Sequence, residues 1–76
     1  MSPATFEKPC ASFPSQIRHD QTYHVRESVD RFPGAIRFFY VTSAVSGRDE
    51  TEAWDDWFTN RADAEDVAKN LAEGVL

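Results

Sequence analysis

The sequence predicts an α+β fold, a small two-layer domain in which one C-terminal amphipathic helix covers a three-stranded antiparallel β-meander. The expected order is β-β-β-α, after an extended proline-rich N-terminal segment. Three observations predict it: two strand-like runs flank a Pro-Gly pair, a third run follows a polar loop, and the last part of the chain has helical periodicity. Its 76 residues are enough for one domain.

Residues 1–21 show no sustained periodicity and are expected to be extended or irregular. Each proline here removes an amide donor and restricts the residue before it. The prolines are Pro3, Pro9 and Pro14, and the apolar side chains are Phe6, Phe13 and Ile17. These side chains allow two interpretations of the segment: it is a strap folded back on the domain, or it is a mobile arm that becomes ordered on a partner. We favour the strap, which leaves residues 22–76 as the compact domain.

Residues 22–29 alternate apolar and polar side chains, as a half-buried strand does. Pro33 and Gly34 then suit the second and third positions of a type II turn. Residues 35–45 are rich in aromatic and β-branched side chains, with apolar residues on both faces. We expect this central strand to be covered by the helix on one face, and by the N-terminal strap or a second copy of the chain on the other.

Residues 52–58 are predicted to form a shorter third strand. The alternation places Trp54 and Phe58 on one face and Trp57 on the other. Asp55 and Asp56 are likewise expected on opposite faces, so they could not act as acid and base on one substrate.

The C-terminal helix is predicted from its ends as well as from its periodicity. Asn60 is a suitable N-cap, with Asp63 as its capping-box partner, and Gly74 provides a left-handed stop. Glu65 and Lys69 are spaced for an i,i+4 ion pair. The stripe expected to face the core consists of Ala64, Val67, Ala68, Leu71, Ala72 and Val75.

Acidic residues are concentrated in the C-terminal part of the chain. Residues 1–48 hold six basic and four acidic residues, a net charge of +2, whereas residues 49–76 hold two basic and nine acidic ones, a net charge of −7. Such asymmetry favours a basic partner, and a solubilising acidic face is the simpler alternative. The single cysteine, Cys10, and the absence of a signal peptide or an apolar run of membrane-spanning length predict a cytoplasmic location.

The residues offer little catalytic chemistry, and we expect neither enzyme activity nor a cofactor. His19 and His24, with Cys10 or Asp20 nearby, do not match the spacing of a zinc site. The carboxylates of Asp49, Glu50 and Glu52 lack the donor order of a calcium loop. We therefore expect no metal site.

These observations favour a non-catalytic protein-interaction module that docks its acidic strand and helix face on a basic, nucleic-acid-handling protein. The candidate partner-binding residues are Asp49, Glu50, Glu52, Trp54, Asp55, Asp56, Trp57, Glu65 and Asp66. Small size, concentrated acid and exposed aromatic candidates resemble, as a class and not by motif, phage antagonists such as anti-CRISPR proteins. That resemblance implies an inhibitor that mimics nucleic acid.

Direct nucleic-acid binding is the alternative hypothesis. Arg26, Arg37 and Arg48 would contact phosphates, and Tyr40, Phe39 or Trp57 would stack on bases. The pI near 4.8 counts against it, because nucleic-acid-binding domains are usually basic.

Overall fold

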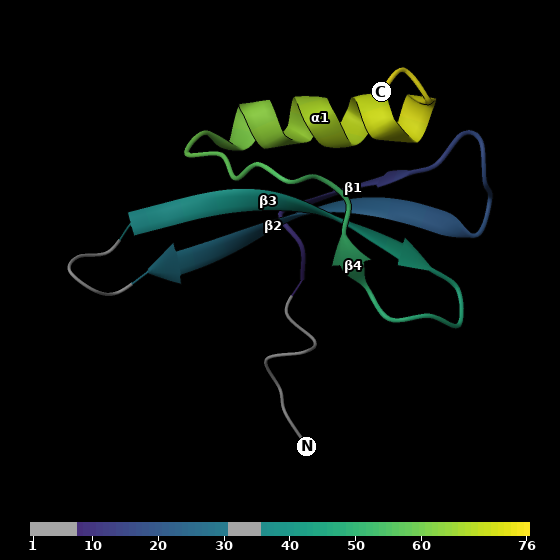
Figure 1. Ribbon diagram of the computed structural model, residues 1–76, viewed down its shortest axis with the longest axis horizontal. Coiled ribbons are helices and arrows are strands. Elements are labelled where there is room, and N and C mark those ends of the chain that lie inside the picture. Colours follow the sequence, from purple (N-terminus) through teal and green to yellow (C-terminus); the bar gives the residue numbers. More distant parts are fainter. Residues whose placement is uncertain (1–7, 31–35) are drawn as a thin grey trace.

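The computed structural model describes residues 8–30 and 36–76. It contains β1 (Ala11–Pro14), β2 (Gln21–Asp30), β3 (Ile36–Val45), β4 (Thr51–Glu52) and α1 (Arg61–Glu73). The strands form one antiparallel sheet in the order β1-β2-β3-β4, and α1 crosses one face of it (Figure 1). The predicted α+β class, antiparallel sheet and C-terminal helix are confirmed. The predicted number of strands is wrong, because the described residues form four.

The additional strand is β1, which lies within the segment expected to be extended or irregular. Ala11 pairs with Val25 and Phe13 with Tyr23, and Phe13 packs against the core. Pro14 is tolerated because β1 is an edge strand that needs no donor on its outer side. Gln16 then donates its backbone N–H to the carbonyl oxygen of Ala72 in α1 at 2.8 Å. Part of the expected strap therefore extends the sheet; Phe6 lies outside the described residues, as does the turn expected at Pro33 and Gly34.

The register of β2 and β3 defines two chemically different faces. Val25 lies opposite Val41, and both are fully buried beneath α1. Odd-numbered residues of these strands share that side, so Tyr23 and Phe39 join the core. Even-numbered residues, among them Arg26 and Tyr40, lie on the other side, which no described helix or strand covers.

The predicted N-cap and the left-handed stop of the helix are confirmed, whereas the described residues show no capping-box hydrogen bond from Asp63. The Asn60 side chain accepts a hydrogen bond from the Ala62 N–H at 2.9 Å, and Gly74 adopts a left-handed φ of 82°. Of the predicted stripe, the buried members are Ala64, Ala68 and Ala72, while Val67 and Leu71 are half-buried. Because α1 ends at Glu73, Val75 lies beyond it and is 69% exposed, contrary to prediction.

One predicted ion pair on the helix is also wrong. The carboxylate of Glu65 pairs with Arg61, one turn earlier, and not with Lys69. Arg61 also donates from Nη2 to the Cys10 carbonyl oxygen at 2.7 Å. Arg61 therefore contacts both the residue before β1 and Glu65 of α1, while its side chain remains 53% exposed.

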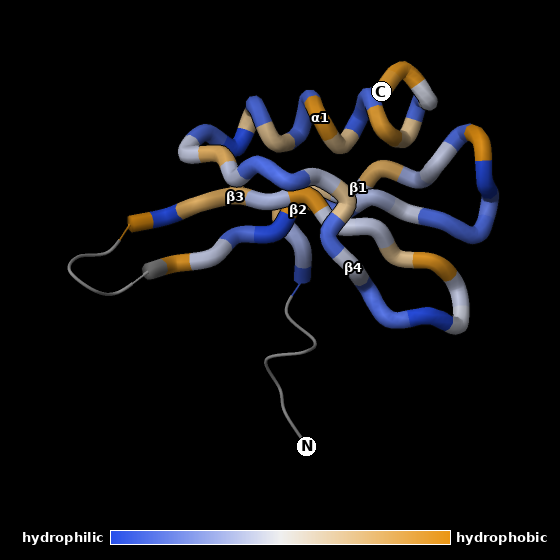
Figure 2. Tube along the Cα trace, in the orientation of Figure 1, coloured by the Kyte–Doolittle hydropathy of each residue, from blue (hydrophilic) through white to orange (hydrophobic). Residues whose placement is uncertain are grey.

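The third predicted strand, 52–58, is interrupted. After β4, Ala53 donates its N–H to the Val41 carbonyl oxygen at 3.0 Å, and the next backbone pairing with β3 is the bridge between Phe58 and Phe39. Residues 54–57 form a bulge between these points, which we call the edge bulge. Figure 2 shows the hydrophilic loop that leads into β4 and the hydrophobic residues along β3. Charged residues and bulges at a sheet edge oppose further strand pairing, so Asp55 and Asp56 are well placed there.

No helix within the described part of the chain has both the length and the hydrophobicity required to cross a membrane.

Candidate functional site

The open face of the sheet carries a cluster of three aromatic rings. Trp57, from the edge bulge, lies 5.0 Å from Phe38 and 6.2 Å from Tyr40 between ring centroids, with tilts of 50° and 36°. Trp54 and Phe58 pack against the core on the helix side, so the predicted split of the tryptophans between the two sides is confirmed. The Trp57 side chain is nevertheless 55% exposed, which is unusual for so large an apolar group. We call these three residues the aromatic cluster.

An exposed carboxylate lies next to the aromatic cluster. The Trp57 indole N–H donates a long hydrogen bond of 3.5 Å to Oε2 of Glu52. Asp49, Asp55 and Asp56 are also exposed, and none of these four acids forms an ion pair with another described residue. Their charge is therefore not neutralised within the described part of the chain.

Asp55 and Asp56 do not lie apart, as a regular strand would require. Together with Ala53 and Trp54 they line one hollow of about 250 Å³. The prediction of opposite faces is wrong because the chain leaves the strand conformation in the edge bulge. The structure thus places both aspartates and the half-buried Trp54 around one hollow.

Glu50 is held in an internal ion pair. Its carboxylate accepts two hydrogen bonds from Arg26, at 2.6 Å from Nε and 2.8 Å from Nη2, and a third from the Thr42 hydroxyl. The Arg26 hydrogen bonds lower the pKa of Glu50 to about 2, assisted by Thr42 and opposed by burial. We conclude that Glu50 stabilises the fold and does not bind a partner, because both of its carboxylate oxygens already accept hydrogen bonds from Arg26.

The lowered pKa of Glu50 predicts a pH-dependent contribution to stability. A depressed pKa in the folded state stabilises the fold above the ordinary value of 4.5, and this stabilisation is lost as the pH falls towards 2. Between pH 6 and pH 3 the wild-type free energy of unfolding should fall by about 1 kcal/mol more than that of Glu50→Gln, after allowance for solvent screening. Urea unfolding at both pH values measures this. Asp49→Asn is the control, and equal pH dependence of Glu50→Gln and wild type would contradict the assignment.

A serine and a histidine also meet on the open face. Oγ of Ser12 lies 2.8 Å from Nδ1 of His24. Burial lowers the pKa of His24, with Glu50 acting in the opposite direction. No hydrogen bond in the described part of the chain orients the other ring nitrogen, so the pair lacks the third member of a catalytic triad. Within the same residues, no three potential ligands gather at a metal site.

The acidic residues of the helix are not part of the same surface. Glu65 is paired with Arg61, and Asp66 lies on α1, which covers the face of the sheet opposite the aromatic cluster. The structure therefore separates Glu65 and Asp66 from Trp57.

The three candidate arginines are also separated. Arg26 lies on the open face in its pair with Glu50, whereas Arg37 lies opposite Val29 on the other face and pairs with Glu27 at 3.3 Å. Arg48 lies in the turn between β3 and β4.

Phe39, proposed as a stacking residue, is in the core, and its neighbour Phe38 lies on the open face instead. The alternation of residues 35–45 predicts that Phe38 and Tyr40 share one side of the sheet. The contact of Trp57 with these two rings could not be predicted, because it depends on the edge bulge.

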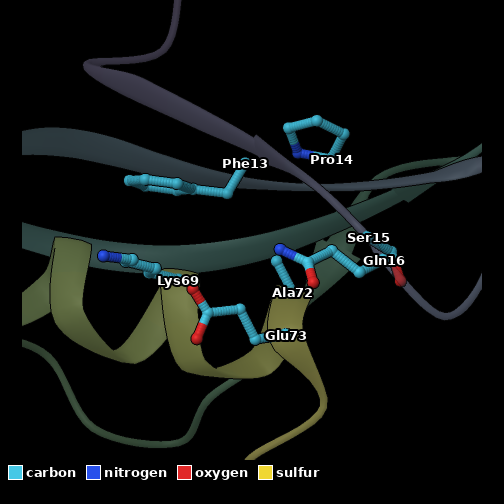
Figure 3. Close-up of a pocket in the computed structure, with 7 residues that line it drawn as sticks. All are labelled: Phe13, Pro14, Ser15, Gln16, Lys69, Ala72 and Glu73. Carbon is cyan, nitrogen blue, oxygen red and sulfur yellow. The ribbon is translucent and has the colours of Figure 1, made fainter.

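A second cleft, of about 320 Å³, lies between β1 and the end of α1. Figure 3 shows the ring of Phe13 on one side and the side chains of Lys69 and Glu73 on the other. The Ser15 hydroxyl accepts from the backbone N–H groups of Ile17 and Arg18, so it stabilises the turn after β1. This cleft contains no nucleophile beside a base.

The chain matches no protein-family model, and comparison with curated proteins and with solved structures finds no similar protein. Functional inference therefore depends on the geometry of the edge bulge and the open face.

Proposed function

We propose that this protein is a non-catalytic interaction module that binds a basic protein through the aromatic cluster and its neighbouring carboxylates. The observation that carries the proposal is Trp57, a tryptophan 55% exposed on the open face of a sheet and hydrogen-bonded to Glu52. Tryptophan is enriched among the residues that dominate interface energies. An exposed indole beside unpaired carboxylates suits a partner surface that is both apolar and positively charged.

The proposed partner is a nucleic-acid-handling protein in the cytoplasm, with the module acting as an inhibitor. Carboxylates on β4 and the edge bulge would attract the same Lys and Arg side chains that bind phosphates. An anti-defence role of the anti-CRISPR kind is the specific form of this proposal. It is supported by the net charge of −5 and by the concentration of acidic residues after position 48.

The test is capture from a cell lysate, identification of the bound protein, and affinity measurement with that protein purified. Trp57→Ala should weaken binding by about tenfold or more. Ile36→Ala is the matched control, because Ile36 is an apolar residue of the same face that is 47% exposed. Competition by duplex DNA is expected if the carboxylates occupy the phosphate site. Equal affinity of wild type and Trp57→Ala would refute the proposal.

A second pair of variants tests where the charge acts. Neutralising Glu52, Asp55 and Asp56 to their amides should weaken binding and reduce its salt dependence. Neutralising Asp63, Asp66 and Glu73 on α1 changes net charge by the same amount and should have little effect. An equal loss of affinity in both triple variants would show that the total charge of the protein, and not the edge bulge, attracts the partner.

Direct nucleic-acid binding is the second candidate, favoured by the three rings on the open face. Base stacking on such rings is effective in other sheet-based binders. Glu52 on the same face and the pairing of Arg26 and Arg37 with carboxylates oppose it. Fluorescence anisotropy with labelled single strands at low salt should show no change. A change that Trp57→Ala abolishes would favour this candidate over protein docking.

A further inference from the structure

We infer that the hollow lined by Ala53, Trp54, Asp55 and Asp56 is a recognition pocket for one arginine side chain. The inference deepens the proposed function, since it assigns the arginine to the basic partner, but it concerns different residues from the aromatic cluster. Its volume of about 250 Å³ is several times the roughly 30 Å³ of a liquid water molecule, so it can hold a long side chain.

The lining of the hollow has the chemistry that a guanidinium requires. Trp54 is half-buried, and because it both packs against the core and lines the hollow, the core holds its ring in place. Asp55 and Asp56 are exposed and form no ion pair with another described residue. A guanidinium stacks flat on an indole and pairs with carboxylates through several N–H groups. The ammonium of lysine can attract the same charges but lacks the planar fork.

The backbone on both sides of the hollow is fixed to β3. Ala53 donates to the Val41 carbonyl oxygen at 3.0 Å, and Phe58 exchanges hydrogen bonds of 2.6 and 2.8 Å with Phe39. The segment that contains Asp55 and Asp56 is therefore hydrogen-bonded to β3 at both of its ends. Such preorganisation reduces the conformational entropy lost when a ligand binds.

The hollow is also placed to act together with the aromatic cluster. Trp57 follows Asp56 directly and turns to the open face of the sheet, whereas Trp54 contacts the core. A partner that contacts Trp57 would therefore bring neighbouring side chains to the sheet edge. We expect an arginine of that partner to enter the hollow.

The experiment is an NMR titration of the whole protein with N-acetyl-arginine amide, following the Trp54 indole N–H and the backbone amides of residues 53–56. Trp57→Phe assigns the two indole signals. N-acetyl-lysine amide tests the need for the planar fork, and N-acetyl-citrulline amide, a neutral ligand of nearly the same shape, tests the need for charge. Arginine amide should give saturable shifts, lysine amide should bind more weakly, and citrulline amide should give none.

Matched double variants localise the effect. Asp55→Asn with Asp56→Asn should weaken arginine-amide binding by about fivefold, the order expected for two exposed ion pairs. Asp63→Asn with Asp66→Asn, which changes net charge equally on α1, should leave it unchanged. Spectra that match wild type away from the substitutions show that each variant is folded. Equal shifts with citrulline amide, or unchanged binding in the Asp55 and Asp56 variant, would overturn the inference.

The outcomes also separate this inference from the proposed function. If arginine amide fails to bind while Trp57→Ala still weakens capture of a basic protein, the aromatic cluster is the docking surface and the arginine pocket is wrong. If arginine amide binds in the hollow but Trp57→Ala has no effect on capture, the pocket stands and the proposed docking surface is wrong.

Discussion

Replacement of Ala68 by leucine is expected to lower the free energy of unfolding by about 1–3 kcal/mol. Ala68 is fully buried, and it lies between Ala64 and Ala72 on the side of α1 that packs against the sheet. A leucine there must push the helix away from the sheet or adopt a strained rotamer, because protein interiors are close-packed. Helix propensity contributes little, since alanine and leucine are both strong helix formers. Urea unfolding of the two proteins measures the difference.

The matched control is Ala62→Leu. Ala62 lies in the same helix but is exposed, so the same substitution should change stability by no more than about 0.5 kcal/mol. If both leucine variants were as stable as wild type, the helix would not pack closely on the sheet through its alanines. A loss in Ala62→Leu equal to that in Ala68→Leu would indicate an effect on the helix itself.

Replacement of Val25 by alanine is expected to lower the free energy of unfolding by about 2–3 kcal/mol. Among the described residues, Val25 and its cross-strand neighbour Val41 have the largest fully buried side chains. Removing two methyl groups loses their transfer free energy and leaves a cavity between β2, β3 and α1. In so small a domain this is a large part of the total stability.

Val29→Ala provides the comparison. Val29 lies in the same strand on the same side but is 44% exposed. Both substitutions exchange a β-branched residue for alanine, so the difference between them isolates burial from strand propensity. We expect Val29→Ala to have less than half the effect of Val25→Ala. Similar losses would mean that Val25 is not at the centre of the core.

Features set by neighbouring residues could be predicted from the sequence. Asn60 and Gly74 determine the ends of α1 through contacts made within one or two turns, so their local chemistry is sufficient. The alternation of residues 35–45 separates Phe38 and Tyr40 from Phe39 and Val41 in the same way. The alternation of residues 52–58 likewise separates Trp54 from Trp57, although the strand expected there is interrupted.

Features set by distant residues could not be predicted. The sequence around β1 contains Pro9 and Pro14, and only pairing with β2 makes Ala11–Pro14 a strand. The sequence predicts Glu50 to be a partner-binding carboxylate, but Arg26, with which it pairs, lies 24 residues earlier and comes near only through the sheet. Asp55 and Asp56 line one hollow because hydrogen bonds at Ala53 and Phe58 force the residues between them out of the strand.

The sequence by itself determined the class of the fold, the helix and its caps, the central strand, and the concentration of acid after position 48. These properties depend on periodicity, capping and composition, which act over a few residues. Only the tertiary structure decided the fourth strand, the pairing of Glu50, and the side of the molecule on which each acid lies. The physical reason is that strand pairing is non-local: the register between β2 and β3, and the bulge at the edge of β3, determine which carboxylates are neutralised and which remain beside Trp57.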